Sequence, residues 1–304
     1  MKSIISVACV FLFSISQADK IDTQMGFPGW EVSTSENLWV GSRHTSYPLW
    51  NLFDNDPKTT WVYSGLDYPK ATTVQGMEFP GEYWIHLSSD KPVLIDELRL
   101  WNGYQKSDKH FFKNSRISEV QIFSDPQALW QSNSGKTIKP VRTLQLKDSP
   151  GAKSIILPSR KYKDIILKIT KIQRGAIDDL CLSEIGLRFK GKNVLPVPKV
   201  FSYTAGDECG CGDTGVLRSM KGKVFGTFSG ESRNHEPFSP SGKFFANLNE
   251  TSIWIVDLRT LKVVYTRPIP KNNYGNIAWI APNRVKYSLG TSNTSRSWKL
   301  TLKD

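Results

Sequence analysis

The chain has 304 residues, of which 39% are hydrophobic, and this is enough for two domains that each bury a core. Lys and Arg total 40 against 28 Asp and Glu, and the net charge of +12 favours acidic polymers or anionic surfaces as partners. Nucleic acid is not an expected partner, because no helical recognition motif and no compact run of basic residues accompanies this charge.

Residues 1–18 read as a secretory signal peptide. Met1 and Lys2 precede an apolar stretch from Ile4 to Ile15, and the small-residue cleavage site ends at Ala18. The apolar stretch is shorter than the roughly 20 residues that span a bilayer, and no later segment is apolar enough. We therefore expect cleavage near Ala18, no transmembrane segment, and a secreted, periplasmic or cell-surface protein.

An acidic turn follows, where residues 51–61 read NLFDNDPKTTW. Asp54 and Asp56 offer carboxylates two residues apart, Thr59 adds a hydroxyl, and backbone carbonyls can complete the six to eight oxygens that calcium prefers. Glu184, expected at the start of the domain's last strand, is the distant carboxylate that would close the shell. Alternatively, Asp54 and Asp56 only cap a tight turn by accepting hydrogen bonds from backbone amides.

Short runs of alternating polarity fill the region between Trp84 and Phe189. They include residues 93–101, 117–122 and 164–169, which are separated by polar turns and show no sustained helical stripe. This pattern is typical of an antiparallel β-sandwich. It predicts an all-β first domain over residues 19–190.

Three shorter motifs accompany the acidic turn: NGYQK at 102–106, NSR at 114–116 and SEI at 183–185. Together, these four motifs resemble the discoidin-like (coagulation-factor C-type) module in the version called the NADase-type glycan-binding domain, over about residues 31–190. The resemblance implies a jelly-roll β-sandwich, a structural calcium site at Asp54, Asp56, Thr59 and Glu184, and glycan recognition rather than catalysis.

This chain departs from the family pattern in two places. Asn55 stands where the family commonly has glycine, and asparagine tolerates the left-handed conformation that such a position requires. The loop from Tyr63 to Phe79 is also longer than the family leads us to expect, so the shape of the pocket is not carried over.

Sugars present apolar ring faces and hydroxyl edges, so their binding sites combine aromatic platforms with polar side chains. The candidates around the acidic turn are Arg43, His44, Trp50, Tyr63 and Tyr68. A second candidate cluster comprises Tyr104, Lys106, Asn114 and Arg116. The alternative for Asn114 and Arg116 is that they tie their loop to the sandwich, and Trp61 is expected to pack inward.

Residues 191–199 contain two prolines and no alternation, and they are expected to be an extended linker. Beyond them, residues 238–246, 252–258 and 262–265 have the rhythm of a propeller blade, but residues 200–304 suffice for only about two blades. We therefore expect a small, propeller-blade-like β domain. It carries 15 basic and 8 acidic side chains from Lys199 onward, so anionic polymers are its candidate partners.

The cysteines do not form a disulfide framework. After signal cleavage Cys181, Cys209 and Cys211 remain, so at most one bond can form, and Cys181 with either of the others is the candidate pair. Cys209 or Cys211 with His235 would make a thiol nucleophile and base, but nothing in the sequence places them together, and these residues fall short of a closed zinc shell.

The sequence thus predicts a secreted, non-enzymatic carbohydrate-binding protein that recognises glycans on a cell or envelope surface. Three alternatives stay open: a protein-interaction or adhesion module, an envelope protein held by its basic second domain, and an accessory or translocation domain that serves a separate enzyme.

Overall fold

The computed structural model describes residues 24–34, 47–64, 72–74, 77–79, 83–128, 138–205, 214–221, 223–229, 238–248, 252–269, 274–291 and 294–302. The predicted signal peptide and several predicted functional residues lie outside these ranges, namely Arg43, His44, Tyr68, Cys209, Cys211 and His235.

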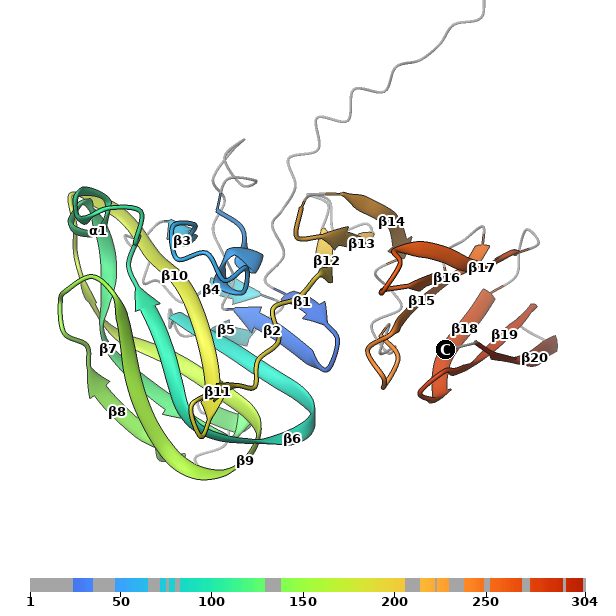
Figure 1. Cartoon of the computed structure of the whole chain (residues 1–304), viewed down its shortest axis with the longest axis horizontal. Helices are drawn as coiled ribbons and strands as arrows, with labels where there is room; N and C mark the ends of the chain where they lie inside the picture. The colour runs from blue at the N-terminus through green and yellow to red at the C-terminus, as the bar shows by residue number, and fades with distance from the viewer. Residues whose placement is uncertain are drawn as a thin grey trace, which may run out of the picture.

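The first half of the chain is almost entirely β-structure (Figure 1). Its elements are β1 (Gln24–Phe27), β2 (Trp30–Thr34), η1 (Leu49–Leu52), β3 (Trp61–Ser64), β4 (Thr72–Val74), β5 (Met77–Phe79), β6 (Tyr83–Asn102), α1 (Asp108–Lys113), β7 (Asn114–Phe123), β8 (Arg142–Gln145), β9 (Ala152–Gln173), β10 (Ile177–Phe189) and β11 (Lys192–Asn193). The three stretches predicted as strands lie within β6, β7 and β9, so the all-β prediction is confirmed.

Four strands close around the main core. β6 pairs with β9, β9 with β7, β7 with β10, and β10 again with β6. The long strand β6 changes its partner along its length: its first part pairs with β2, and its last part pairs with β10. Register shifts in the β6–β9 ladder, between Ser88 and Val93 and between Ile95 and Glu97, mark the bends that this requires.

The alternation seen in the sequence supplies this core. Ile85, Leu87, Ile95, Leu98 and Leu100 of β6 are fully buried, and Trp61 is buried as predicted. The buried side chains of β9 lie in its central part, from Ile155 to Ile169, where exposed or partly exposed residues separate most of them. One departure from the prediction concerns Glu184, which lies in the middle of β10 rather than at the start of that strand.

The second half contains β12 (Val200–Ala205), β13 (Thr214–Ser219), β14 (Val224–Ser229), β15 (Phe244–Leu248), β16 (Ser252–Asp257), β17 (Lys262–Pro268), β18 (Tyr274–Ala281), β19 (Arg284–Thr291) and β20 (Thr294–Thr301). β15–β17 and β18–β20 form two three-stranded antiparallel sheets, in the orange-to-red part of Figure 1. A second β domain therefore follows the first, as predicted.

The sheet β15–β17 is covered on both faces. Ile253 and Ile255 of β16 join a core with residues of β18 and β19, whereas Trp254 and Val256 join a separate core with Leu217 of β13. Since both faces are buried, β16 is an uninterrupted apolar run, from Ile253 to Val256. The stacking of successive small antiparallel sheets agrees with the blade-like rhythm of the sequence.

The two halves share a sheet. β12 pairs antiparallel with β1, so β12, β13 and β14 extend the sheet of the first half. The segment predicted as a linker is partly structured, because Lys192 and Asn193 form β11 and pair with β10. The prolines are compatible with this arrangement, since they lie after β11 and require no ladder hydrogen bond there. The main-chain ladder therefore runs across the predicted domain boundary.

Among the described residues, no helix combines the length and apolar character that crossing a bilayer takes.

Candidate functional site

The acidic turn is held by its own side chains. The backbone amide of Asp56 donates to Oδ1 of Asp54 (2.9 Å), and that of Lys58 donates to Oδ1 of Asp56 (3.0 Å). The Thr59 hydroxyl lies 2.8 Å from Oδ2 of Asp54 and 2.9 Å from the carbonyl of Asp56. These are the capping contacts of a tight Asx turn, which was the alternative to a cation site.

Asn55 has the left-handed backbone conformation expected of the glycine position, with φ of 61°. Its backbone amide points at the distant carboxylate and donates to Oε1 of Glu184 at 3.3 Å. Glu184 is therefore brought to the turn from β10, as the sequence predicted.

Two carboxyl groups share this region. Burial and, to a smaller extent, the nearby charge of Asp54 raise the pKa of Glu184 to about 9, although the hydrogen bond from the Asn55 amide opposes this increase. Burial also raises the pKa of Asp54. Oε2 of Glu184 is buried, and among the described residues it has no hydrogen-bond partner. Two neighbouring, partly buried carboxyl groups repel each other when both are ionised, so Glu184 and Asp54 favour either a proton on one carboxyl group or a cation bound between them.

The residues present fit a calcium ion in part. Asp54, Glu184 with its unpartnered oxygen, and the turn's carbonyls are hard oxygen donors of the kind calcium takes. Asp56 is exposed and directs one carboxylate oxygen to its own turn. In the described part of the chain, no three His, Cys, Asp or Glu side chains form a group that could hold a metal. A calcium ion here would thus rely on two carboxylates and on backbone oxygens.

The second motif is fixed to the same part of β10. Ser183 donates from its hydroxyl to the carbonyl of Gly103 (2.9 Å) and accepts from the backbone amide of Gln105 (3.1 Å). Thr60, from the acidic turn, donates to the carbonyl of Leu182 (3.1 Å). Because both motifs meet at residues 182–184, the three distant sequence signals belong to one structural unit.

The Asn-Gly pair of the second motif has a clear structural role. The Asn102 side chain donates to the carbonyl of Ile117 (2.7 Å) and accepts from its amide (2.9 Å), which joins β6 to β7. Gly103 has φ of 79°, and a Cβ there would lie 3.0 Å from Phe111 and Arg116 side-chain atoms. Only glycine satisfies both the backbone conformation and the close packing.

Arg116 and Asn114 brace the loop. Arg116 is only 3% exposed, makes a bidentate ion pair with Asp148 (2.7 Å for each contact), and donates to the carbonyl of Asn114 (2.9 Å). The Asn114 side chain donates to the carbonyl of His110 (2.7 Å) within α1. The polar groups of Arg116 and Asn114 bond to other protein groups, so nothing here supports their predicted contact with a ligand. The contacts agree with the alternative prediction, in which both residues tie the loop to the sandwich.

Tyr104 lies in an aromatic cluster at the loop end of the sandwich. Its ring centroid is 5.1 Å from that of His110 in α1 and 6.1 Å from that of Tyr47, both edge to face. Tyr47 is 38% exposed, and Tyr104 and His110 are half-buried. Burial raises the pKa of Tyr104. Lys106 is exposed on the same loop, so of the second predicted cluster Tyr104 and Lys106 are the residues open to solvent.

Tyr47 and His110 were not among the residues singled out from the sequence. The sequence feature that could have indicated Tyr47 as a binding residue is the aromatic-rich segment YPLW at 47–50, just before the acidic turn. His110 carried no signal, because the short helix α1 that presents it was expected to be a loop. Its N-cap Ser107 accepts from the His110 amide (3.3 Å), and this contact starts the helix.

Trp50 and Tyr63 are not open platforms. The Trp50 ring stacks on Phe201 of β12 at 4.8 Å, and the guanidinium of Arg218 from β13 lies 4.9 Å from its centroid. Tyr63 packs edge to face on Tyr83 at 4.7 Å, and both join the main core. The sequence predicted Trp50 as a sugar contact. It could not show that β12 and β13 pack against η1 and cover the Trp50 ring. In this structure it belongs to the contact between the two halves.

Cys181 is a free, buried thiol, and burial holds its pKa well above the ordinary value, so it is not an activated nucleophile.

Comparison with solved structures returns proteins of low sequence identity to this chain. A CBM32 module from Clostridium perfringens, solved with GalNAc-β-1,3-galactose, is 11% identical, with a TM-score of 0.37, covering 53% of this chain and 95% of its own. An F5/8 type C domain from Bacteroides fragilis is 17% identical, with a TM-score of 0.35, covering 52% and 89%.

A Ruminococcus gnavus GH29 fucosidase in complex with fucose is 14% identical, with a TM-score of 0.34; the match covers 52% of this chain but only 25% of that enzyme. A search of curated proteins returned no match.

At the level of sequence families, residues 28–188 match the NAD glycohydrolase translocation F5/8 type C domain. The matched region is more than half of the 304 residues and contains the acidic turn, the loop of Asn102 to Arg116 and Glu184. The same region is the β-sandwich described above. The chain therefore belongs to the NAD glycohydrolase translocation F5/8 type C domain family, which is discoidin-like.

Proposed function

We propose that this protein is a non-catalytic carbohydrate-binding protein that recognises glycans at the loop end of its discoidin-like sandwich. The observation that carries the proposal is the cluster of Tyr47, Tyr104 and His110 beside Lys106, on loops fixed to β10. Aromatic rings held at fixed angles offer apolar faces to a sugar at little cost in conformational entropy.

A glycan array with purified protein tests the proposal. Tyr104→Ala should reduce the signal about tenfold or more, because one ring of the cluster is removed. Ile156→Ala is the control, since it removes an exposed apolar side chain from β9, outside the loops. Binding to a protein partner with no glycan signal would refute the proposal and favour an adhesion module.

We further propose that calcium braces the acidic turn through Asp54 and Glu184, with Thr59 and Asp56 contributing through the turn they form. The support is the buried, unpartnered oxygen of Glu184 beside a second carboxyl group. Calcium should raise the melting temperature of the wild type, and Glu184→Gln should abolish that increase. An identical increase in both proteins would place the ion elsewhere.

The family description favours a second candidate, an accessory or translocation role for a separate enzyme. Here the same loops would guide delivery of that enzyme, and Tyr104→Ala would impair its delivery to cells without changing its activity in solution. We also propose that the chain is exported through the predicted signal peptide, and the mass of the exported protein would show cleavage near Ala18. We propose in addition that the basic second domain binds anionic polymers.

A further inference from the structure

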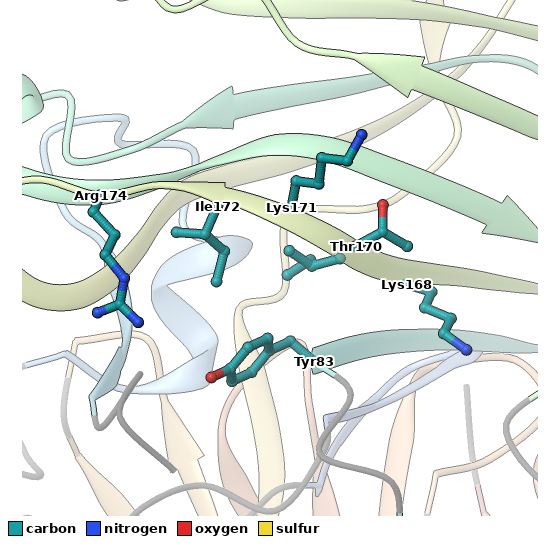
Figure 2. A pocket seen from close by; sticks show the side chains of 7 residues that line it. Tyr83, Lys168, Thr170, Lys171, Ile172 and Arg174 are labelled. Carbon is teal, nitrogen blue, oxygen red and sulfur yellow. The ribbon is translucent and has the colours of Figure 1, made fainter. Parts of the chain in front are cut away.

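A pocket of about 430 Å³ opens beside Tyr83 of β6 and the last part of β9, as Figure 2 shows. Lys168 and Arg174 line it, but both residues, like Tyr83, already have interaction partners within the protein. Lys171 also lines it and is paired with Glu119 at 2.9 Å. The cations of this pocket are therefore engaged, whereas three exposed cations of the second domain have no such partner among the described residues.

The C-terminal part of the chain carries cations without acidic residues between them. From Leu258 to Lys303 the sequence contains no Asp or Glu, whereas Lys and Arg recur throughout. The sheet β18–β20 lies within this stretch, in the orange-to-red part of Figure 1. No carboxylate side chain of the sheet itself can therefore offset its cations.

One face of this sheet is buried and the other is exposed. Val285 and Tyr287 of β19 pack in the core shared with β15–β17, whereas Arg284 and Lys286 of the same strand are exposed. In the ladder, Lys286 lies opposite Lys299 of β20, which is also exposed. Because side chains alternate between the two faces of a sheet, Arg284, Lys286 and Lys299 lie together on the exposed face, and we call these three residues the basic face.

The basic face places like charges side by side. Side chains directly opposite each other in an antiparallel pair have Cβ atoms about 4.5–5.5 Å apart, and like charges at such positions are destabilising. Lys286 and Lys299 are opposite each other, and Arg284 lies two residues from Lys286 on the same strand. Within the described part of the chain, no salt bridge joins any of the three to an acidic side chain. An external anionic surface would offset this repulsion.

An apolar side chain stands at one end of the basic face. Ile280 of β18 is 43% exposed, and it lies at the end of the sheet where the β18–β19 turn leads to Arg284. Its neighbour Trp279 packs against the buried core, so Ile280 belongs to the exposed face. The turn is fixed, because the Asn283 side chain donates to the carbonyl of Leu302 (3.1 Å) and the Leu302 amide donates to the carbonyl of Asn283 (2.8 Å). Cations beside an exposed apolar side chain are typical of a surface that lies at a membrane interface.

We propose that the basic face docks on an anionic lipid membrane, with its three cations at the phosphates of the headgroups and Ile280 inserted between the headgroups. The inference goes beyond the polymer binding proposed for the second domain, because a bilayer supplies both negative charge and an apolar layer beneath it, whereas a soluble polyanion supplies charge alone. A sugar is not favoured, since the exposed residues of this sheet, where the structure describes their side chains, include no aromatic ring for stacking.

Sedimentation of the full chain with lipid vesicles tests the docking. The vesicles contain phosphatidylcholine alone or mixed equally with phosphatidylglycerol, and the wild type should bind the anionic vesicles more tightly, with an affinity that falls as salt is added. Arg284→Gln, Lys286→Gln and Lys299→Gln combined should weaken this binding about a hundredfold, since each cation near an anionic bilayer contributes about fivefold. Ile280→Ser alone should weaken it about threefold or more, because the apolar contact is lost.

Lys91→Gln, Lys161→Gln and Lys163→Gln combined form the matched control, because they remove the same charge from exposed positions of the first domain. This control should retain vesicle binding, and melting curves verify that every variant is folded. Equal loss in both triple variants would overturn the inference, since net charge alone would then explain the binding. Binding of a heparin tetrasaccharide or an oligothymidylate through the basic face, without vesicle binding, would also overturn it and would assign the face to a soluble polymer.

Discussion

Glu184 combines burial, a neighbouring carboxyl group and an unpartnered oxygen in one side chain. Its pKa is raised from 4.5 to about 9, so the folded chain keeps a proton that the unfolded chain releases. The resulting stabilisation is fully present below about pH 4.5 and is lost as the pH rises towards about 9. This one residue therefore makes the first domain's stability depend on pH in the absence of a cation.

The pH dependence can be measured by denaturant unfolding in chelator from pH 5 to pH 9. The wild type should lose stability with a slope of at most about 1.4 kcal/mol per pH unit, and Glu184→Gln should flatten it, because the amide does not ionise. Asp56→Asn, in the same turn but exposed, is the control and should keep the slope. The same slope in Glu184→Gln would contradict the assignment.

Arg116 tests whether the second motif serves structure or binding. Arg116→Lys removes the bidentate pair with Asp148 and the contact to the Asn114 carbonyl, so it should lower the free energy of unfolding by about 1–3 kcal/mol. Asp148→Asn should cost less, because Asp148 is 44% exposed and the carbonyl contacts remain. A stable Arg116→Lys protein that has lost glycan binding would instead make Arg116 a ligand contact.

At the scale of elements, the loop between β6 and β7 owes its shape to Asn102, Gly103 and the short helix α1. The Asn102 side chain joins β6 to β7 through the backbone of Ile117, and Gly103 leaves room for the ring of Phe111. The loop then carries Tyr104 and His110, whose ring centroids lie 5.1 Å apart, and it is anchored to β10 through Ser183.

Gly103→Ala should destabilise the protein by about 2–3 kcal/mol, from the left-handed strain and from the clash with Phe111. Gly151→Ala provides the comparison, since Gly151 also has positive φ but nothing lies within 4 Å of an added Cβ. Its expected loss is about 1 kcal/mol, from strain alone. Equal losses in chemical denaturation would show that packing at Gly103 contributes nothing.

At the scale of the whole molecule, the two halves are joined by the ladder of β1 with β12 and by the Trp50–Phe201 stack. Figure 1 shows β12–β14 between the sandwich and the two small sheets. Such a continuous sheet couples the stabilities of the two parts.

Phe201→Ala should lower the free energy of unfolding by about 3–5 kcal/mol and should shift the unfolding of the sandwich as well, because Phe201 is fully buried against Trp50. Val224→Ala, at an exposed position of the same three strands, should change stability by less than about 0.5 kcal/mol. Calorimetry gives both values, and an unchanged sandwich transition in Phe201→Ala would mean that the halves unfold independently.

The sequence alone determined the all-β class and the acidic turn with a residue, Asn55, that tolerates the left-handed conformation, because alternation and turn chemistry are local properties of the chain. Only the tertiary structure decided which side chains are available to a ligand. Burial, stacking and charge pairing depend on neighbours distant in sequence: Phe201 and Arg218 cover Trp50, Asp148 pairs with Arg116, and the Asn55 amide meets Glu184 of β10.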